Sequence, residues 1–223
     1  MKIRYLFFLL PALLLACEGS DQIENRSQDQ ESTAAKSPPG HDEIDGRDTI
    51  RAKAQSEFVT FFTQFQTAVY NEDADAFNHF MDSERGVYII ENPGAMPKMT
   101  LVKDIRNFKR DFQQQSFFTI KDGLQSCKLK EETLPTFNCE GQTGGNTGYS
   151  KEGCFVADAE AFRKTEMHKY ASLPENELKN IEKTLPLVQK TVVQTATSYQ
   201  FHFGQINGKW KVLFIDLRIP CSA

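Results

Sequence analysis

The chain has 223 residues, of which 39% are hydrophobic and 25% are charged, and its formal net charge is −4. This length and composition are typical of a soluble globular protein with one domain and appendages. The sequence lacks the clustered basic patch of nucleic-acid binders, so we expect no nucleic-acid partner. Phenylalanine is dense from Phe58 to Phe118 and again from Phe201 to Phe214, which indicates where the globular domain lies.

The first sixteen residues have the pattern of an export signal. Lys2 and Arg4 precede a short apolar run that cannot span a bilayer. The run ends in LLAC at residues 14–17, which resembles the lipobox of bacterial lipoproteins. This resemblance implies that residues 1–16 are a signal peptide and that Cys17 is lipidated and becomes the mature N-terminus. An ordinary secretory peptide with an incidental cysteine is the alternative.

A polar segment follows the predicted lipidation site. It is rich in Ser, Gln, Asp, Glu and Lys and has no apolar periodicity, so it cannot bury enough surface to offset its ordering entropy. We expect residues 17–49 to combine the lipidated Cys17 with a disordered tether that reaches about 30 Å. Glu18, not Asp, follows Cys17, and this favours the outer membrane. The protein is predicted to be lipid-anchored in the cell envelope, facing the periplasm or the cell surface.

Residues 50–223 are predicted to form one globular domain that begins with two helices. Large apolar residues recur at helical spacing and predict an amphipathic helix over about residues 50–70; they are Phe58, Phe61, Phe62, Phe65 and Val69. Asp73 is a suitable N-cap for a second, short helix that ends near Asp82. Residues 87–90 are expected to be a strand, which ends before the turn sequence NPG at residues 92–94.

The middle of the chain is predicted to mix helices and strands. Helical spacing of apolar residues predicts a helix over residues 101–112, and residues 117–120 have the composition of a strand. Residues 127–139 are expected to form a hairpin around Thr133. The glycine-rich residues 141–148 are interpreted as a surface loop, because the Gly-Lys-Ser/Thr ending of a phosphate-binding loop is missing.

Two further helical segments are expected before the last strands. Residues 158–170 are interpreted as a helix, or as a strand that leads into one. Residues 174–184 are predicted to form a helix, because Pro174 suits its first position and Glu175 and Glu177 favour its first turn.

The C-terminal residues 191–217 are predicted to form two long strands joined at Asn207-Gly208. An Asn-Gly pair between β-rich runs is a strong hairpin signal, because a type I′ turn needs positive φ at both central residues. A two-residue turn fixes the register. Phe203 is then expected to face Val212.

Farther from this turn, the same register predicts two functional pairs. Phe201 would face Phe214, Tyr199 would face Asp216, and all four side chains would lie on the concave face of the sheet under the first helix. A β-bulge near Thr197 is the alternative. It would send Tyr199 or Asp216 to the outer face and bring Gln200 or His202 into its place.

The order of these elements is that of an α+β domain, with N-terminal helices packed on a curved, mostly antiparallel sheet that ends in a long β-hairpin. The segments FFxxFxxAVYNxDxxxF at residues 61–77 and GKWKVLFID at residues 208–216 resemble the first helices and the last strand of nuclear transport factor 2-like domains, which are cystatin-like α+β folds. This resemblance implies a cone-shaped fold around a pocket. Some members use the pocket for isomerase, dehydratase or cyclase chemistry, and many use it for binding alone. Residues 127–186 are longer and richer in Cys and Gly than in a minimal member.

Few residues in the chain have a spacing that indicates chemistry. No two His lie four residues apart and no Cys-x-x-Cys occurs, so we predict neither a metal site nor a cofactor. The remaining catalytic candidates are Asp216 and Tyr199. A carboxylate desolvated by aromatic walls has a raised pKa and could act as a base beside a tyrosine hydroxyl donor. A structural hydrogen bond between the two is the preferred alternative, and His202 is a lesser candidate.

Two functions therefore remain in view. In the preferred one, the domain binds a small apolar or amphipathic ligand, or an envelope protein, in a pocket lined by Tyr199, Phe201, Phe214 and Asp216. In the alternative, the domain is an isomerase- or dehydratase-like enzyme with Asp216 as the base and Tyr199 as the hydrogen-bond donor. An enzyme needs an acid-base group that reaches into a cavity, whereas a binding module needs only the walls.

The four cysteines after Cys17 are predicted to form two disulfides, because exported domains fold in an oxidising compartment. Four cysteines allow three pairings. Cys127 with Cys139 is the first choice, since a hairpin between them would place them opposite each other. Cys154 would then pair with Cys221.

Overall fold

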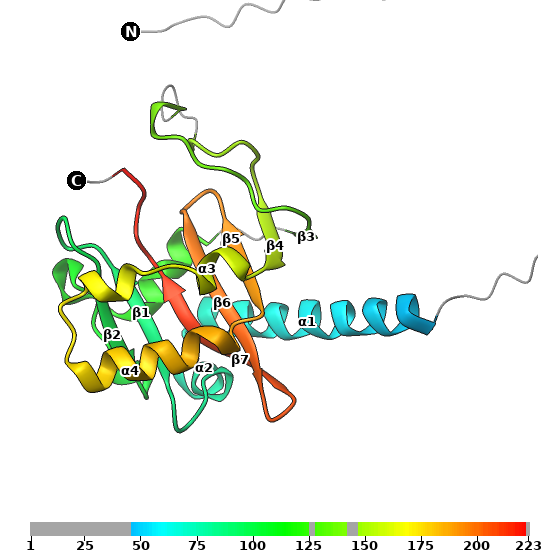
Figure 1. The fold of residues 1–223 in the computed structure, drawn as a ribbon, viewed down its shortest axis with the longest axis horizontal. Coiled ribbons are helices and arrows are strands. Elements are labelled where there is room, and N and C mark those ends of the chain that lie inside the picture. Colours follow the sequence, from blue (N-terminus) through cyan, green and yellow to red (C-terminus); the bar gives the residue numbers. More distant parts are fainter. Residues whose placement is uncertain (1–45, 125–127, 142–146, 222–223) are drawn as a thin grey trace, which may run out of the picture. The chain divides into compact units, whose positions relative to one another are not determined.

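The computed structural model describes residues 46–124, 128–141 and 147–221. The predicted signal peptide, Cys17, most of the predicted tether and Cys127 lie outside the described residues. The described part is an α+β fold with a seven-stranded sheet in the order β2-β1-β7-β6-β5-β4-β3 (Figure 1). Two neighbouring pairs, β1 with β7 and β3 with β4, are parallel and the rest are antiparallel. The predicted α+β class and the mostly antiparallel sheet are thus confirmed.

The sheet consists of the following strands: β1 (Val87–Glu91), β2 (Lys98–Val102), β3 (Leu129–Glu131), β4 (Cys154–Asp158), β5 (Lys190–Gln194), β6 (Tyr199–Ile206) and β7 (Lys209–Asp216). The α-helices are α1 (Gly46–Tyr70), α2 (Ala74–Phe80), α3 (Glu160–Arg163) and α4 (Glu175–Thr184). Short 3₁₀ helices connect them: η1 (Ile105–Asn107), η2 (Phe112–Gln114), η3 (Phe117–Asp122), η4 (Cys139–Gly141), η5 (Met167–Tyr170) and η6 (Leu185–Leu187). Among the described residues, no helix combines the length and the apolarity needed to cross a membrane.

The two N-terminal helices are present as predicted. Helix α1 begins at Gly46, so the last residues of the predicted tether are helical. Its side chains Phe58, Phe62 and Phe65 are buried against β6, where the ring of Phe65 lies 5.5 Å from that of Phe201 and 5.4 Å from that of Phe203. Asp73 caps α2, because its side chain accepts a hydrogen bond from the backbone nitrogen of Ala76 at 2.9 Å.

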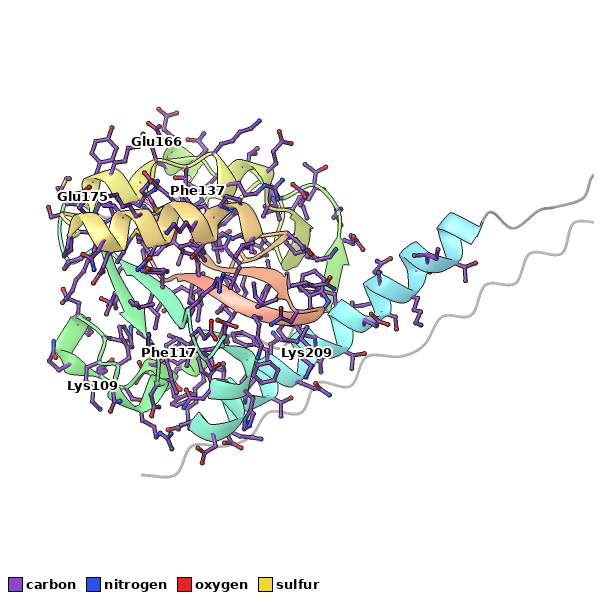
Figure 2. All side chains as sticks on the ribbon, turned by 60° about the horizontal axis from the view of Figure 1, so that its bottom comes forward. Lys109, Phe117, Phe137, Glu166, Glu175 and Lys209 are labelled. Atoms are coloured by element: carbon purple, nitrogen blue, oxygen red, sulfur yellow. A yellow bond between two sulfur atoms is a disulfide. The ribbon has the colours of Figure 1, made fainter. Side chains whose placement is uncertain are left out.

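Helices cover both faces of the sheet. One core lies between the sheet and α1, α2 and η3, and the other lies between the sheet and α3 and α4. Figure 2 shows the sheet between these layers, with Phe117 on the side of α2 and Glu175 at the start of α4. A sheet that is covered on both faces accounts for the nearly continuous apolar character of β1, all of whose residues are buried.

Two predictions in the middle of the chain are wrong. Residues 101–112 do not form a helix, because Leu101 and Val102 end β2, which pairs along its length with β1. Residues 117–120 do not form a strand but lie in the 3₁₀ helix η3, whose first turn is capped by Ser116. Short apolar runs fit a buried turn as well as a buried strand, and here tertiary packing under α1 and α2 decided the outcome.

The predicted hairpin at residues 127–139 is also absent from the described residues. Strand β3 pairs in parallel with β4, and Phe137 makes an isolated bridge with Tyr149 instead of returning to β3.

Asp158 ends β4, and α3 follows it. Helix α4 begins after Pro174, as predicted.

The predicted long strand from Thr191 is divided in two. A turn at residues 195–198 separates β5 from β6, and Ser198 in this turn has a left-handed backbone with φ 64°. The two strands then pair antiparallel, with Val192 opposite Phe201. Strands β6 and β7 pair antiparallel around Asn207 and Gly208, whose φ angles of 52° and 73° are those of the predicted turn.

A β-bulge changes the register in which β6 and β7 pair, starting between Phe203 and His202. Phe203 lies opposite Val212, as predicted, but His202 lies opposite Phe214, so Leu213 is the extra residue. Ile215 therefore faces Phe201, and Asp216 faces Gln200. The predicted pairing of Tyr199 with Asp216 is wrong, because it required a register without a bulge. The alternative, a bulge near Thr197, also misplaced the bulge, which lies at Leu213.

The bulge also separates the four predicted pocket residues. Tyr199 and Phe201 pack in the core under α1, whereas the ring of Phe214 lies 5.4 Å from Tyr88 and 5.1 Å from Phe162 in the core under α3. Phe201 and Phe214 are both buried. The prediction of one shared concave face is therefore wrong.

Strand β6 passes close to η6 at Gly204, and a substitution there tests this contact. A Cβ atom on Gly204 would overlap the carbonyl oxygen of Leu187 and would lie 2.9 Å from Cδ1 of Leu213. We expect Gly204→Ala to lower the free energy of unfolding by about 1–3 kcal/mol, as overpacking does. Urea denaturation measures this loss.

Gly94→Ala is the matched control. A Cβ atom at Gly94 meets nothing within 4 Å, so its effect on the free energy of unfolding should be small. Equal losses in the two variants would contradict the close contact at Gly204.

Candidate functional site

Two clefts flank the C-terminal tail, which we define as residues 217–221 and which follows β7 (red in Figure 1). The aromatic cleft has a volume of about 680 Å³ and is lined by residues of β1, the loop 110–115, the start of β6 and the tail. The polar cleft has a volume of about 470 Å³ and is lined by residues of the loop 92–97, the start of β6, the end of β7, and the tail. Asn92 and Ile219 line both clefts.

Apolar side chains form one side of the aromatic cleft. Phe112 is 65% exposed and Ile219 is 54% exposed, although both are large hydrophobic residues. Tyr199, at the start of β6, is half-buried, and Leu217 is buried beneath the cleft. Exposed apolar residues that gather at a cleft are typical of a binding site.

The loop that carries Phe112 has an unusual backbone. Gln113 and Gln114 both have left-handed conformations, with φ angles of 55° and 53°. Non-glycine residues rarely adopt this region unless surrounding contacts hold them there, and such residues cluster at binding sites. This backbone therefore supports a functional role for the loop that presents Phe112.

Paired charges form the other side of the aromatic cleft. The buried carboxylate of Glu91 accepts hydrogen bonds from the backbone nitrogen of Asp111 at 3.1 Å and from Nε of Arg110 at 3.4 Å. The carboxylate of Asp111 in turn pairs with Nζ of Lys98 at 2.5 Å. These contacts hold the loop against β1. Because the charges are balanced, the wall offers polar contacts without a strong field of one sign.

Asp216 lies at the polar cleft and is bound by Arg218. Its buried carboxylate accepts hydrogen bonds from the backbone nitrogen, Nε and Nη2 of Arg218, the shortest at 2.6 Å. These hydrogen bonds and the charge of Asp216 raise the pKa of Arg218, although partial burial opposes them. The carboxylate is bound by Arg218 and has no Tyr199 beside it, so the geometry predicted for a catalytic base is wrong.

Tyr149, which was not among the predicted site residues, is the tyrosine that interacts with Asp216. Burial raises the pKa of Tyr149, a hydrogen bond with Ser198 lowers it, and the negative charge of Asp216 raises it further. Tyr149 follows the glycine-rich segment and belongs to no strand of the sheet. No periodic pattern in the sequence could have placed it near β7.

His202 lies in the core and lines neither of the two clefts. Its Nδ1 is 2.9 Å from the hydroxyl oxygen of Thr191, and its ring stacks on Phe162 with 3.4 Å between the centroids. Its Nε2 has no hydrogen-bond partner within the described part of the chain. Burial, and to a smaller extent the positive charge of Arg218, lower the pKa of His202 to about 3. These features indicate a neutral, structural histidine.

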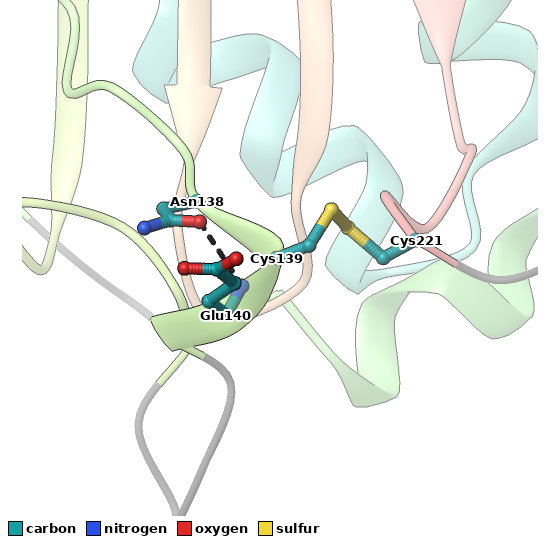
Figure 3. Close-up of a disulfide and its surroundings, with 4 residues drawn as sticks. All are labelled: Asn138, Cys139, Glu140 and Cys221. Atoms are coloured by element: carbon teal, nitrogen blue, oxygen red, sulfur yellow. Dashed lines mark hydrogen bonds between the residues drawn. A yellow bond between two sulfur atoms is a disulfide. The ribbon is translucent and has the colours of Figure 1, made fainter.

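A disulfide joins the tail to the middle of the chain. Cys221 is bonded to Cys139 in η4, with 5.9 Å between the Cα atoms (Figure 3). The predicted pairs Cys127–Cys139 and Cys154–Cys221 are therefore wrong, because the expected hairpin is missing and η4 lies beside the tail. Cys154 is also disulfide-bonded.

No group of three or more metal-ligating side chains gathers within residues 46–124, 128–141 and 147–221. The chain matches no protein-family model, and searches of the curated proteins and of the solved structures gave no match.

The buried neutral state of His202 predicts a pH-dependent stability. The folded-state pKa is below the ordinary value of 6.5, so the unfolded chain binds a proton first. The stability that the protein gains by holding His202 neutral is fully present above pH 6.5 and is lost as the pH falls toward 3. We expect this loss to lower the free energy of unfolding by about 2 kcal/mol between pH 7 and pH 5.

Urea denaturation at several pH values tests this expectation. His202→Gln should lack this pH-dependent part of the loss. His79→Gln, which replaces an exposed histidine, should retain it. Parallel pH profiles for the wild type and His202→Gln would contradict the assignment to His202.

Proposed function

We propose that the globular domain binds a small amphipathic ligand in the aromatic cleft. The observation that carries this proposal is the combination, in one cleft of about 680 Å³, of the exposed Phe112 and Ile219 with the balanced charges around Glu91. A ligand that covers these two side chains removes apolar surface from water. Clefts of this size, with apolar walls and a few fixed polar groups, suit small molecules.

The lining of the cleft supports a ligand with an uncharged polar end. Its apolar part would contact Phe112, Ile219 and the ring of Tyr199. Its polar end would bind the amides of Gln113 and Gln115, which both donate and accept hydrogen bonds. The charged wall groups are already paired with one another, so a charged ligand would have to compete with an existing partner.

This proposal changes the roles of the predicted site residues. Tyr199 stays in the ligand site, but Phe201 and Phe214 are core residues that support the sheet, and Asp216 belongs to the polar cleft. An envelope protein whose exposed apolar side chain enters the aromatic cleft is the second kind of partner. The isomerase- or dehydratase-like alternative loses support, since Arg218 binds the carboxylate that it requires as a base.

We further propose that the domain is nuclear transport factor 2-like and cone-shaped. Its support is the pair α1 and α2 on one face of a mostly antiparallel sheet that ends in the strands β6 and β7. The layer with α3 and α4 is then an addition to the minimal fold, and it comes from the long segment that the resemblance left unmatched.

We also propose that Cys17 carries lipid and anchors the protein in the cell envelope, at the outer membrane. The lipobox-like sequence supports the anchor. The disulfide between Cys139 and Cys221 agrees with an oxidising compartment such as the periplasm.

Titration with Nile red, an uncharged dye that fluoresces in apolar sites, tests ligand binding. Phe112→Ala should weaken dye binding about tenfold, because it removes a large apolar contact. Tyr170→Ala is the control, since Tyr170 is 59% exposed and lines neither cleft. Equal affinities of the wild type and Phe112→Ala would place any dye site elsewhere and would overturn the proposed function.

Mass spectrometry of the mature protein tests the anchor. The expected mass is that of residues 17–223 with acyl chains on Cys17. Cys17→Ser should be released from membranes, whereas Cys139→Ser should remain bound. Membrane-bound Cys17→Ser protein of unchanged mass would contradict lipidation.

A further inference from the structure

The tail is a wall of the proposed ligand site. Its first residue, Leu217, continues β7, and its backbone nitrogen donates a hydrogen bond to the carbonyl oxygen of Ile90 at 2.9 Å. Ile219 then lies between the two clefts and lines both. The position of Ile219 therefore decides whether the aromatic cleft has its second apolar side.

Burial of apolar surface contributes little to the position of Ile219 in the tail. Ile219 is 54% exposed, so packing contributes little to its position. Hydrogen bonds from Arg218 to Asp216 hold the start of the tail, and the covalent bond from Cys221 to Cys139, two residues beyond Ile219, holds its end. This bond joins residues separated by 82 positions in the sequence. Reduction removes this constraint and increases the conformational freedom of the tail.

The Cys139–Cys221 disulfide is accessible to solvent. Cys139 and Cys221 are both exposed, whereas Cys154 is 1% exposed. Thiol–disulfide exchange requires a thiolate to reach a sulfur atom, so a reductant should reach Cys139 and Cys221 more readily than Cys154. The fold thus places an accessible disulfide at the cleft.

We propose that the Cys139–Cys221 disulfide is a redox latch that holds the tail against the aromatic cleft, so that a dithiol reductant controls ligand binding. This inference rests on the proposed ligand site. A thiolate of the reductant attacks one sulfur, forms a mixed disulfide and releases the other cysteine as a thiolate. The second thiol of the reductant then displaces the mixed disulfide. The reductant leaves as a disulfide, and the protein gains two thiols.

Limited reduction of the full-length protein with dithiothreitol tests the latch. Alkylation and peptide mapping should show Cys139 and Cys221 modified while Cys154 stays oxidised. The affinity for Nile red should then fall about tenfold, through the loss of the Ile219 contact. Reoxidation should restore it.

Two variants distinguish the loss of the Cys139–Cys221 bond from the loss of the Ile219 contact. Cys221→Ser should bind the dye as weakly as the reduced protein and should not respond to dithiothreitol. Ile219→Ala keeps the bond but removes most of the apolar contact, so reduction should change its affinity much less than that of the wild type. Since the wild type is measured in both redox states, the test stands even if Cys221→Ser does not fold.

Hydrogen exchange distinguishes a failure of the latch from a failure of the proposed function. If the oxidised protein binds no dye, the proposed function is wrong and exchange alone judges the latch. Faster exchange at residues 217–221 after reduction supports a latch, and unchanged exchange overturns it. If the oxidised protein binds the dye with an affinity that reduction leaves unchanged, control of binding by the latch is overturned, whatever the exchange rates are.

Discussion

The packing of α1 on β6 is the contact on which the rest of the domain depends. Phe58, Phe62 and Phe65 are buried and lie within 5.4–5.8 Å of the ring of Phe203. Aromatic pairs at these separations gain energy beyond the burial of their area. The contact fixes which face of β6 points toward α1. The opposite face is then available to the layer with α3 and α4, and the outer strands extend from the pair that β6 forms with β7.

The bulge at Leu213 decides which face of the sheet the last residues of β7 occupy. Without the extra residue, Asp216 would point toward α1 beside Tyr199, and a carboxylate would enter an aromatic core. With it, Phe214 and Asp216 point to the other side, where Asp216 meets Arg218. A charged group is costly to bury without partners, so the register that gives Asp216 a guanidinium partner is the favourable one. The same shift separates Tyr199 from Asp216 and gives each its own cleft.

Local patterns in the sequence predicted α1, α2, α4, β1 and the turn at Asn207-Gly208, because helical periodicity, an N-cap and a two-residue turn act within a few residues. They failed where distant contacts decide. The apolar run at Phe117 fits a strand or a buried turn equally well. The bulge depends on packing on both faces of β7, and the pairing of Cys139 with Cys221 depends on the path of the whole middle segment. Of the predicted site, Tyr199 lines the aromatic cleft. Phe112 was assigned to a helix that does not form, and Ile219 and Tyr149 lie in segments without a periodic pattern.

The location of the clefts follows from the way in which both faces of the sheet are covered. Phe201 fills the layer under α1 and Phe214 fills the layer under α3, so the residues expected to line an internal pocket serve instead as core. Space for a ligand then lies at the rim, where strands end and connecting segments must cross. A cleft wall made from a connecting segment lacks the hydrogen bonds of a sheet. Each such segment is therefore held in place by other contacts. The loop 110–115 has the ion pairs of Glu91 and Asp111. The tail has the contact between Arg218 and Asp216 at its start and a disulfide at its end. The disulfide is the constraint that a reductant can open, so the tail, and not the loop, is the part of the proposed site suited to redox control.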